Sequence, residues 1–349
     1  MFNKLVGNDQ IKNIFQRLLQ SGRLPNSLLF TGKNGIGKKL FAFELAKAFA
    51  CQTPKNSEAC DNCPACLRAD KFNIPTNAEK SDEFKKVFFS EHSDIGMVTA
   101  YKNNILIDAI RSLEVESNFR PYEAKARFFI IDGADKMNDA AANALLKTLE
   151  EPSITSHIFL ITSRPNSLFQ TIRSRCQTVR FAPIEPFEIE NHLLSTKNFA
   201  PDDAKLLSKL ADGSIGRALN LDLDKFRERR ETMVKTLESL IAKQNLAPLL
   251  RTAEEMNDAK NKESYGEYLE ILQTLTHDVW TLCYDPISDK INNADLILQL
   301  KKLAQNADKQ RLADWLRQIE ILQENFSINL NKKIATDALF LKMATGKGN

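Results

Sequence analysis

A glycine-rich stretch near the N-terminus constrains the fold of this chain more than any other feature. The stretch is Thr31-Gly32-Lys33-Asn34-Gly35-Ile36-Gly37-Lys38-Lys39, which follows the apolar run Ser27–Phe30 and precedes a helical stretch from Leu40 to Ala50. In the order strand, glycine loop, helix, successive backbone N–H groups can turn toward one anion, and the helix N-terminus adds positive charge. The sequence therefore predicts an α/β domain with a phosphate-binding loop (P-loop).

The loop has the glycines and the lysine of a nucleotide site but lacks one chemical group. Gly32, Gly35, Gly37 and Lys38 stand where phosphate-binding residues belong. The next residue in such loops is Ser or Thr, whose hydroxyl ligates Mg²⁺. Here it is Lys39, and a charged ammonium cannot ligate a metal. ATP and magnesium binding by this loop therefore stays open.

A second apolar strand supplies the other half of such a site. Arg127–Ile131 is apolar after its first residue and ends in Asp132, whose carboxylate is expected to hold magnesium. In ATPases of this kind a Glu that polarises the attacking water usually follows, but here the residue is Gly133. Asp135 is offset, and we expect it to cap the next helix. Because two groups are missing, we expect no ATP hydrolysis by this chain.

Four cysteines lie close together in the sequence, namely Cys51, Cys60, Cys63 and Cys66. Two C-x2-C steps allow backbone turns to direct sulfurs at one ion, and Cys51 can complete a tetrahedron. An iron–sulfur cluster is the main alternative, but the ferredoxin pattern places its fourth cysteine downstream. His92 is distant and not needed as a fifth ligand. The pattern predicts a closed structural zinc site rather than four free cysteines.

Composition restricts the class of protein without identifying it. The chain has 349 residues, 43% of them hydrophobic and 27% charged, with a net charge of +3, so two or three globular domains are expected. Weak basicity permits a nucleic-acid partner without arguing for one. No apolar run is long enough to span a membrane and no signal peptide is evident, so we expect a cytoplasmic protein. The isolated Cys176 and Cys283 are expected in the core.

The order of elements predicts three regions. Residues 1–183 alternate strands and helices, as in an α/β P-loop module with a parallel sheet, and carry the inserted zinc module at 51–66. Residues 184–224 form a small helical region, and 225–349 an all-helical domain. Strands are expected at Ser27–Phe30, Ile95–Thr99, Arg127–Ile131, Ile158–Thr162 and Thr178–Phe181. The polar, lysine-rich residues 71–93 are expected to form a mobile surface insertion.

Helical periodicity is clearest near the C-terminus. An apolar stripe recurs at helical spacing in Leu312, Trp315, Leu316, Ile319, Leu322 and Phe326. We expect these side chains in the core of a helical bundle, and the alternative is packing against other subunits. The last four residues, 346–349, are expected to fray.

A basic loop precedes the last predicted strand and contains Arg173 and Arg175. Both charges could simply be solvated. Alternatively, a guanidinium could be presented to a phosphate of a neighbouring subunit, because its planar geometry suits phosphate better than lysine does. We interpret Arg173 as solvated.

Two motifs resemble signatures of bacterial sliding-clamp loaders. They are Asp139-Ala140-Ala141-Ala142-Asn143-Ala144-Leu145-Leu146-Lys147-Thr148-Leu149-Glu150-Glu151-Pro152 and Ser174-Arg175-Cys176. Within that family, the residues at Lys39 and Gly133 resemble a non-motor member, because the motor subunits of tau/gamma type normally keep Ser or Thr and Glu there. The likeness is dense in the N-terminal part and looser over the C-terminal helices.

The resemblance implies an AAA+ module, a helical lid, and a collar that holds a five-subunit ring. It implies that Arg175 reaches into the ATP site of an adjacent motor subunit, and that Arg217 matches a lid arginine that contacts nucleotide in its own subunit. The implied partners are tau/gamma and delta subunits, the sliding clamp and, through the complex, primer–template DNA. The chain would be a subunit of a DNA-directed DNA polymerase holoenzyme, a nucleotidyltransferase complex, without catalysing alone.

Three hypotheses follow from these observations. The first is a non-catalytic clamp-loader subunit that completes the ATPase site of a partner. The second is an active DNA-dependent ATPase of tau/gamma type, against which Lys39 and Gly133 argue. The third is an unrelated zinc-containing AAA+ adaptor without a role in replication.

Overall fold

A computed structural model describes residues 2–75, 81–197, 199–242, 246–258, 264–288, 290–325 and 331–345. The chain divides into two compact units. Unit 1 comprises Met1–Phe199 and Ala211–Leu219, and unit 2 comprises Ala200–Leu210 and Asn220–Asn349. The predicted domain boundaries after residues 183 and 224 stay a prediction.

Unit 1 is built on a six-stranded sheet in the order β2-β3-β4-β5-β1-β6. The strands are β1 (Ser27–Thr31), β2 (Phe88–Phe89), β3 (Ile95–Thr99), β4 (Arg127–Asp132), β5 (Ser156–Thr162) and β6 (Gln177–Arg180). All neighbours are parallel except β2 and β3. The five predicted strands are confirmed to within two residues at their ends, and so is the predicted α/β class with a mostly parallel sheet and C-terminal helices.

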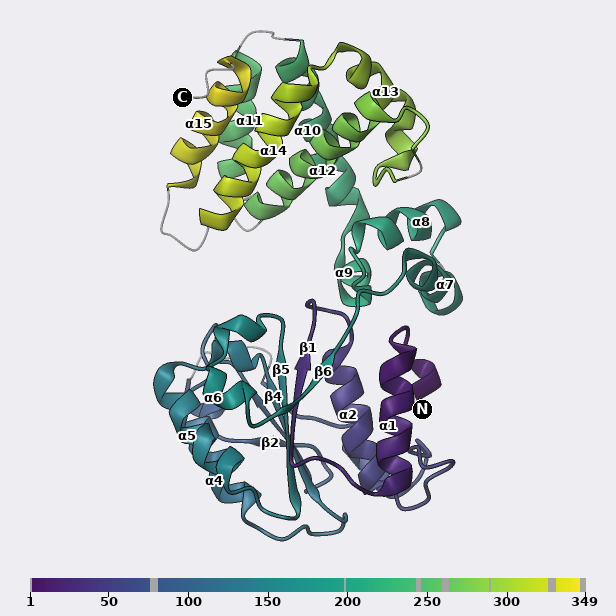
Figure 1. Cartoon of the computed structure of the whole chain (residues 1–349), viewed down its shortest axis with the longest axis vertical. Helices are drawn as coiled ribbons and strands as arrows, with labels where there is room; N and C mark the ends of the chain where they lie inside the picture. The colour runs from purple at the N-terminus through teal and green to yellow at the C-terminus, as the bar shows by residue number, and fades with distance from the viewer. Residues whose placement is uncertain are drawn as a thin grey trace. The chain divides into compact units, whose positions relative to one another are not determined.

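Helices cover both faces of this sheet, with α1 and α2 on one face and α4, α5 and α6 on the other (Figure 1). The helices of unit 1, including short 3-10 helices (η), are η1 (Phe2–Lys4), α1 (Asp9–Ser21), α2 (Lys38–Ala50), α3 (Pro64–Ala69), η2 (Ser81–Lys85), α4 (Ile107–Ser117), η3 (Ala134–Lys136), α5 (Asp139–Glu150), η4 (Pro165–Ser167), α6 (Gln170–Arg173), α7 (Pro186–Lys197) and α9 (Ile215–Asn220). Burial on both faces explains why β4 is apolar from Phe128 to Ile131, which are fully buried.

The α2 face of the sheet has an aromatic core. The ring of Phe30 on β1 lies 5.8 Å from Phe15 on α1 and 5.9 Å from Phe181, and Phe41 on α2 lies 5.1 Å from Phe181. These contacts fix the first turn of α2, which follows the glycine-rich loop, against the sheet.

The predicted mobile insertion at 71–93 is wrong for the described residues beyond 80. Phe88–Phe89 pairs antiparallel with β3 as the edge strand β2, and Phe84, Val87 and His92 are buried. The prediction missed this strand because lysines surround a short apolar run, which pairs with the neighbouring strand β3. Residues 76–80 lie outside the described part of the chain.

In the described part of unit 2, every secondary-structure element is a helix. Its elements are α8 (Pro201–Leu210), α10 (Leu223–Ile241), α11 (Ala247–Asn257), α12 (Tyr265–Tyr284), η5 (Ala294–Leu296), α13 (Ile297–Asn306), α14 (Lys309–Glu324) and α15 (Lys332–Thr345). The predicted stripe is confirmed as core at Leu312, Trp315 and Ile319, which are buried in the main cluster of this unit. Phe326 and 346–349 lie outside the described residues.

The two isolated cysteines were predicted to lie in the core. Cys176 is buried in the core of unit 1, and Cys283 packs against the core of unit 2, as predicted.

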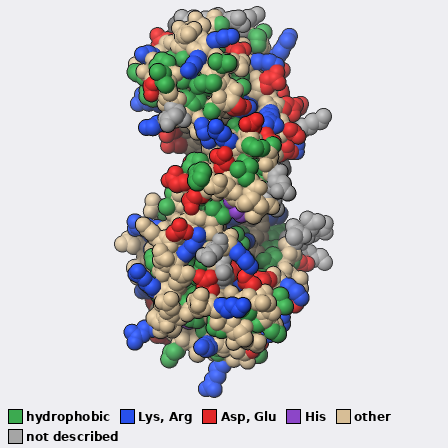
Figure 2. Space-filling view, turned by 90° about the vertical axis from the view of Figure 1, so that its right-hand side faces the viewer, with side chains coloured by type: hydrophobic (Ala, Val, Ile, Leu, Met, Phe, Trp, Pro, Cys, Tyr) green, Lys and Arg blue, Asp and Glu red, His purple; other side chains and the backbone are tan. Residues whose placement is uncertain are grey.

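On the face drawn in Figure 2, lysine and arginine side chains are interspersed with acidic ones instead of forming one extended basic surface. No helix in the described part of the chain is both long and apolar enough to cross a membrane.

Candidate functional site

The P-loop connects β1 to α2, as the sequence predicted. Gly35 (φ 72°) and Gly37 (φ 102°) adopt left-handed backbone conformations, and Gly37 is the residue that caps α2. Side chains rarely adopt these conformations, so glycine is needed at both positions. The loop therefore has the backbone shape of a phosphate-binding loop.

The side chain of Lys38 bonds to the backbone of its own loop. Lys38 Nζ donates hydrogen bonds of 2.6 Å to the carbonyl oxygens of both Gly32 and Lys33. Burial lowers the pKa of Lys38 to about 8. An incoming phosphate would have to compete with these carbonyls for the ammonium group.

Lys39 occupies the position at which a magnesium ligand is expected. Its Nζ lies 2.9 Å from Oδ2 of Asp132 at the end of β4, so the two residues that would share a metal ion form an ion pair instead. The ammonium of Lys39 therefore neutralises the carboxylate of Asp132 without a divalent cation. The sequence indicated the missing hydroxyl, and the structure adds that the substituted side chain neutralises the remaining carboxylate.

Gly133 differs from a catalytic glutamate position in its backbone as well as in its side chain. Its φ of 80° is left-handed, and a Cβ built on it would lie 3.2 Å from Cδ of Lys136. A glutamate would therefore be strained there whatever its chemistry. The second missing group thus reflects a local backbone conformation that glycine favours.

The expectation that Asp135 caps the next helix is wrong. The N-cap of α5 is Asn138, whose side chain accepts a hydrogen bond from the N–H of Ala141. Asp135 instead accepts hydrogen bonds from Thr162 Oγ1 at 2.7 Å and from Arg164 Nε at 3.1 Å. It therefore ties the end of β4 to the end of β5.

A segment far along the chain bonds to the P-loop, which sequence reasoning missed. Ser214 donates its hydroxyl to the carbonyl of Asn34 (2.8 Å), and the N–H of Gly216 donates to the carbonyl of Gly35 (2.8 Å). The N–H of Arg217 donates to the Ser214 hydroxyl, and its side chain is exposed. These contacts within unit 1 hold the loop closely without involving nucleotide.

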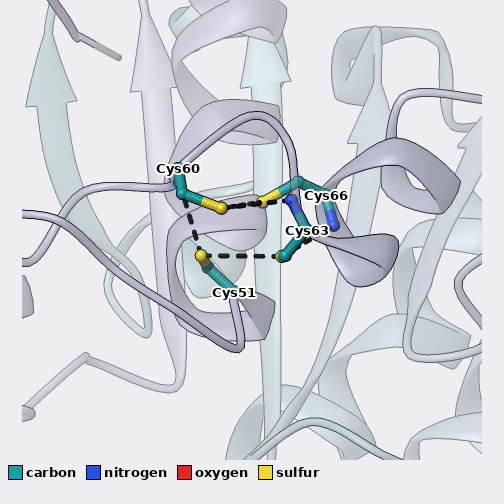
Figure 3. A group of neighbouring side chains, drawn as sticks. All are labelled: Cys51, Cys60, Cys63 and Cys66. Atoms are coloured by element: carbon teal, nitrogen blue, oxygen red, sulfur yellow. Dashed lines mark hydrogen bonds between the residues drawn. The ribbon is translucent and has the colours of Figure 1, made fainter.

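The four predicted cysteines come together at the other end of α2. Figure 3 shows them converging from the end of α2, the loop after it and the start of α3. All four sulfurs lie within 4.8 Å of one another, and the Cys51–Cys63 and Cys60–Cys66 sulfurs are 3.9 Å apart. Disulfide sulfurs are about 2 Å apart, whereas four sulfurs around one zinc ion are about 3.8 Å apart. The arrangement therefore fits a tetrahedral metal ion.

Hydrogen bonds to sulfur prepare part of this cluster to lose protons. They lower the pKa of Cys60 to about 5, and the largest effect comes from the hydroxyl of Thr53, 3.2 Å away. Burial alone would raise the pKa of Cys63, but backbone N–H donors outweigh it and the pKa is lowered. Burial raises the pKa of Cys51 and Cys66. A divalent cation would favour the thiolate form of all four.

His92 takes no part in the cysteine cluster, as expected. It is fully buried, and its Nε2 lies 3.4 Å from Oε1 of Glu123. Glu123 also pairs with Arg68 of α3. His92 therefore lies beside the ion pair between Arg68 and Glu123, which attaches α3 to the segment before β4.

The two arginines of the basic loop have different surroundings. Arg175 is exposed, and its guanidinium donates to the carbonyl of Thr171 (2.8 Å) and pairs with Glu150 at the end of α5 (2.6 Å). Arg173 is half-buried and donates to Oδ1 of Asn166 (3.3 Å), so its interpretation as a solvated charge is wrong. Arg175 is therefore the more accessible guanidinium of the two.

Several known proteins are similar to this chain. A family model described as DNA polymerase III, delta subunit matches residues 7–185. DNA polymerase III subunit delta' from Bacillus subtilis is 28% identical over 97% of this chain and 96% of its own length. The subunit delta' from Escherichia coli is 27% identical over 94% and 92%, respectively. Subunit tau from Bacillus subtilis is 28% identical over 78% of this chain and 46% of its own length.

The delta' relatives thus match this chain nearly end to end, whereas tau matches over less than half of its own length. The family match extends over more than half of the 349 residues and includes the P-loop, the cysteine cluster and Arg175. The chain therefore belongs to the family of the DNA polymerase III delta subunit.

Proposed function

We propose that this chain is a non-catalytic subunit of delta' type in the clamp loader of DNA polymerase III. In this proposal it joins tau/gamma and delta subunits in a five-membered ring that loads the sliding clamp onto primer–template DNA. The Lys39–Asp132 ion pair is the observation on which the absence of catalysis chiefly rests, since it takes the place of the magnesium ligands. Near full-length similarity to two delta' subunits supports the family role.

The nucleotide site of this chain would contribute little to the work of the complex. Gly32, Gly35, Gly37 and Lys38 retain the shape of the loop, and weak binding of nucleotide phosphates through them stays part of the proposal. Turnover is not expected, because Gly133 cannot orient a water molecule.

Arg175 would act on the nucleotide of a neighbouring motor subunit. As the γ-phosphoryl group leaves, charge builds up on its outer oxygens, and an arginine placed against them is worth on the order of a thousandfold or more in rate. Arg175 is exposed, and its guanidinium donates to the carbonyl of Thr171 and pairs with Glu150. Five N–H donors leave room for a phosphate in addition to those two partners.

The cysteine cluster would hold a structural zinc ion. The ligands would be Cys51, Cys60, Cys63 and Cys66, with no position left for a substrate. When bound, zinc would cross-link the end of α2 to α3 and the turn between them. It would take no part in ATP chemistry.

The test is ATP hydrolysis by a reconstituted complex that carries Arg175→Ala. Clamp- and DNA-stimulated hydrolysis should fall partially, because only one site of the ring loses its arginine, and clamp loading should slow. Ring assembly and zinc content should not change. Arg180→Ala, which removes an exposed arginine from the same unit, is the matched control. Normal clamp loading by Arg175→Ala would refute the role in trans.

The tau-type motor is the competing function within the family. It predicts ATP turnover by the purified chain that Lys38→Ala abolishes. The ion pair of Lys39 argues against it. An unrelated adaptor is not supported, because the chain belongs to the polymerase III family.

A further inference from the structure

A buried lysine lies beside the cysteine cluster and contacts three separate pieces of chain. Lys47 is in the last turn of α2, and its side chain is only 4% exposed. Its Nζ lies 3.0 Å from Glu44, 2.9 Å from Asp61 and 3.0 Å from Asp70. Lys4 also pairs with Asp61, at 2.6 Å, so two ammonium groups face three carboxylates.

The partners of Lys47 lie on the segments that carry the four cysteines. Lys47 and Glu44 are on α2, whose C-cap is Cys51. Asp61 is in the turn between Cys60 and Cys63, and Asp70 is the C-cap of α3, the helix that contains Cys66. One ammonium group therefore joins all the segments that supply sulfur.

The turn at Asp61 is one of the places in this loop where the backbone benefits from such a contact. Asp61 has a left-handed backbone (φ 63°), which costs free energy for any residue other than glycine, although Asp and Asn tolerate it best. Its carboxylate is held by two lysines, while the N–H of Cys63 donates to the sulfur of Cys60 at 3.2 Å. The ion pairs thus hold the conformation in which these two sulfurs face the centre of the cluster.

We propose that Lys47 is a positioning residue of the metal site. It holds the three segments at metal-binding spacing whether or not metal is present, and so reduces the cost of organising the site when an ion binds. Groups just outside a metal's ligands commonly change its affinity about 10- to 100-fold when they are replaced. This inference rests on the proposed zinc site and adds a determinant outside the four cysteines.

The experiment compares metal retention by full-length variants. Zinc is titrated out of Lys47→Met with a chromophoric chelator, and Co²⁺ is substituted to read the geometry of the thiolate site from its visible spectrum. We expect affinity about 10- to 100-fold weaker than in the wild type, an altered cobalt spectrum and a retained helical circular-dichroism signal. Lys71→Met is the control, because Lys71 pairs with Glu91 near the same module but is 62% exposed.

A second variant covers the case in which Lys47→Met does not fold. Asp61→Asn keeps a residue that tolerates the left-handed turn but removes the charge paired with both lysines. It should also weaken zinc binding, and in a double-mutant cycle the two losses should not add, because both remove the same ion pair.

The outcomes separate this inference from the zinc proposal. Wild-type protein that holds no zinc would overturn both. Zinc-loaded wild type, together with Lys47→Met and Asp61→Asn variants of unchanged affinity and cobalt spectrum, would overturn only the role of Lys47. Equal weakening by Lys71→Met would show a general charge effect and would also overturn it.

Discussion

The two ends of helix α2 carry sites that have kept very different amounts of their chemistry. At the N-terminal end the P-loop keeps its backbone shape, but Lys38 bonds to loop carbonyls and Lys39 neutralises Asp132. At the C-terminal end all four cysteines are present and their sulfurs converge. One helix thus connects two different sites. In the P-loop, the charged groups bond to one another, whereas in the cysteine cluster four possible ligands face a common centre.

The contrast shows that a chain can contain a sequence motif without the functional groups that usually accompany it. The P-loop has a structural role in this chain, because it connects β1 to α2 and bonds to Ser214 and Gly216. Among the residues that the structure describes, no side chain takes the place of an ion inside the cysteine cluster. Four thiols in one small space are most stable when a cation holds them as thiolates.

The largest expected effect is the loss of bound zinc when one cysteine at the C-terminal end of α2 is replaced. Cys63→Ser removes one of four ligands, and bound zinc should fall from about one per chain to near zero. Apparent zinc-binding free energies reach about 10–16 kcal/mol in small zinc domains, so the region from Cys51 to Asp70 should lose protection from hydrogen exchange first. Metal analysis and hydrogen exchange measure both effects. The comparison fails if the variant retains zinc, or if unit 2 loses protection together with this region.

A smaller effect is expected from restoring a carboxylate next to Asp132. Gly133→Glu places a side chain on a left-handed backbone and should lower the free energy of unfolding by about 1–2 kcal/mol. It should add no ATP turnover, because the strained backbone does not set the carboxylate in a catalytic position. Thermal unfolding and an ATPase assay check these points.

A matched variant separates strain from chemistry at this position. Gly133→Asn should be less destabilised than Gly133→Glu, since Asn tolerates a left-handed backbone. If Gly133→Glu were as stable as the wild type, backbone conformation would not explain the missing glutamate.

Replacing Lys39 should make the P-loop end more like an ordinary nucleotide site. Lys39→Thr removes a partly exposed ion pair, so stability should change by no more than about 1 kcal/mol. It leaves Asp132 unpaired and supplies a hydroxyl, so magnesium should tighten nucleotide binding about tenfold, the effect of a charge-assisted contact. Titration with a fluorescent ATP analogue, with Mg²⁺ or EDTA, measures this change.

The wild type is the reference for that titration and should show no magnesium dependence. Lys33→Thr, which removes a loop lysine paired with Asp212, is the control for lost charge. Magnesium-dependent binding by the wild type would mean that the ion pair does not close the metal position.

The smallest effect is a pH dependence of the core between the two sites. His157 stacks on Phe128, and burial lowers its pKa below the ordinary value of about 6.5. The unfolded chain therefore binds a proton more readily than the folded one. Consequently, the free energy of unfolding should fall, by no more than about 1 kcal/mol, as the pH drops below 6.5. Denaturant unfolding of the wild type and of His157→Gln between pH 7.5 and about 5.5 measures the contribution of His157 to this pH dependence.

Zinc content has to be measured in the same pH series, because acid also competes with metal for thiolates. His157→Gln should lose the core contribution while releasing zinc as the wild type does. Identical pH curves for the two proteins would show that the histidine does not contribute.

Local sequence alone determined much of this protein. The glycine loop, the five main strands and the cysteine spacing were predictable, because each depends on residues close together in the chain. The absence of a hydroxyl at Lys39 and of a carboxylate at Gly133 was equally plain from residue type. Strand β2 was missed because two residues have no period of their own and depend on pairing with β3.

Only the tertiary structure decided how the two sites are completed. Lys39 meets Asp132 across 93 residues of sequence, and Ser214 meets Asn34 across 180. Lys47 gathers carboxylates from α2, the cysteine turn and α3. Such contacts join segments that the fold brings together, and charge pairing over long separations leaves no periodic signal in a sequence. Composition and spacing therefore specify which groups are available, whereas the packing of α2 against the sheet determines which of them meet.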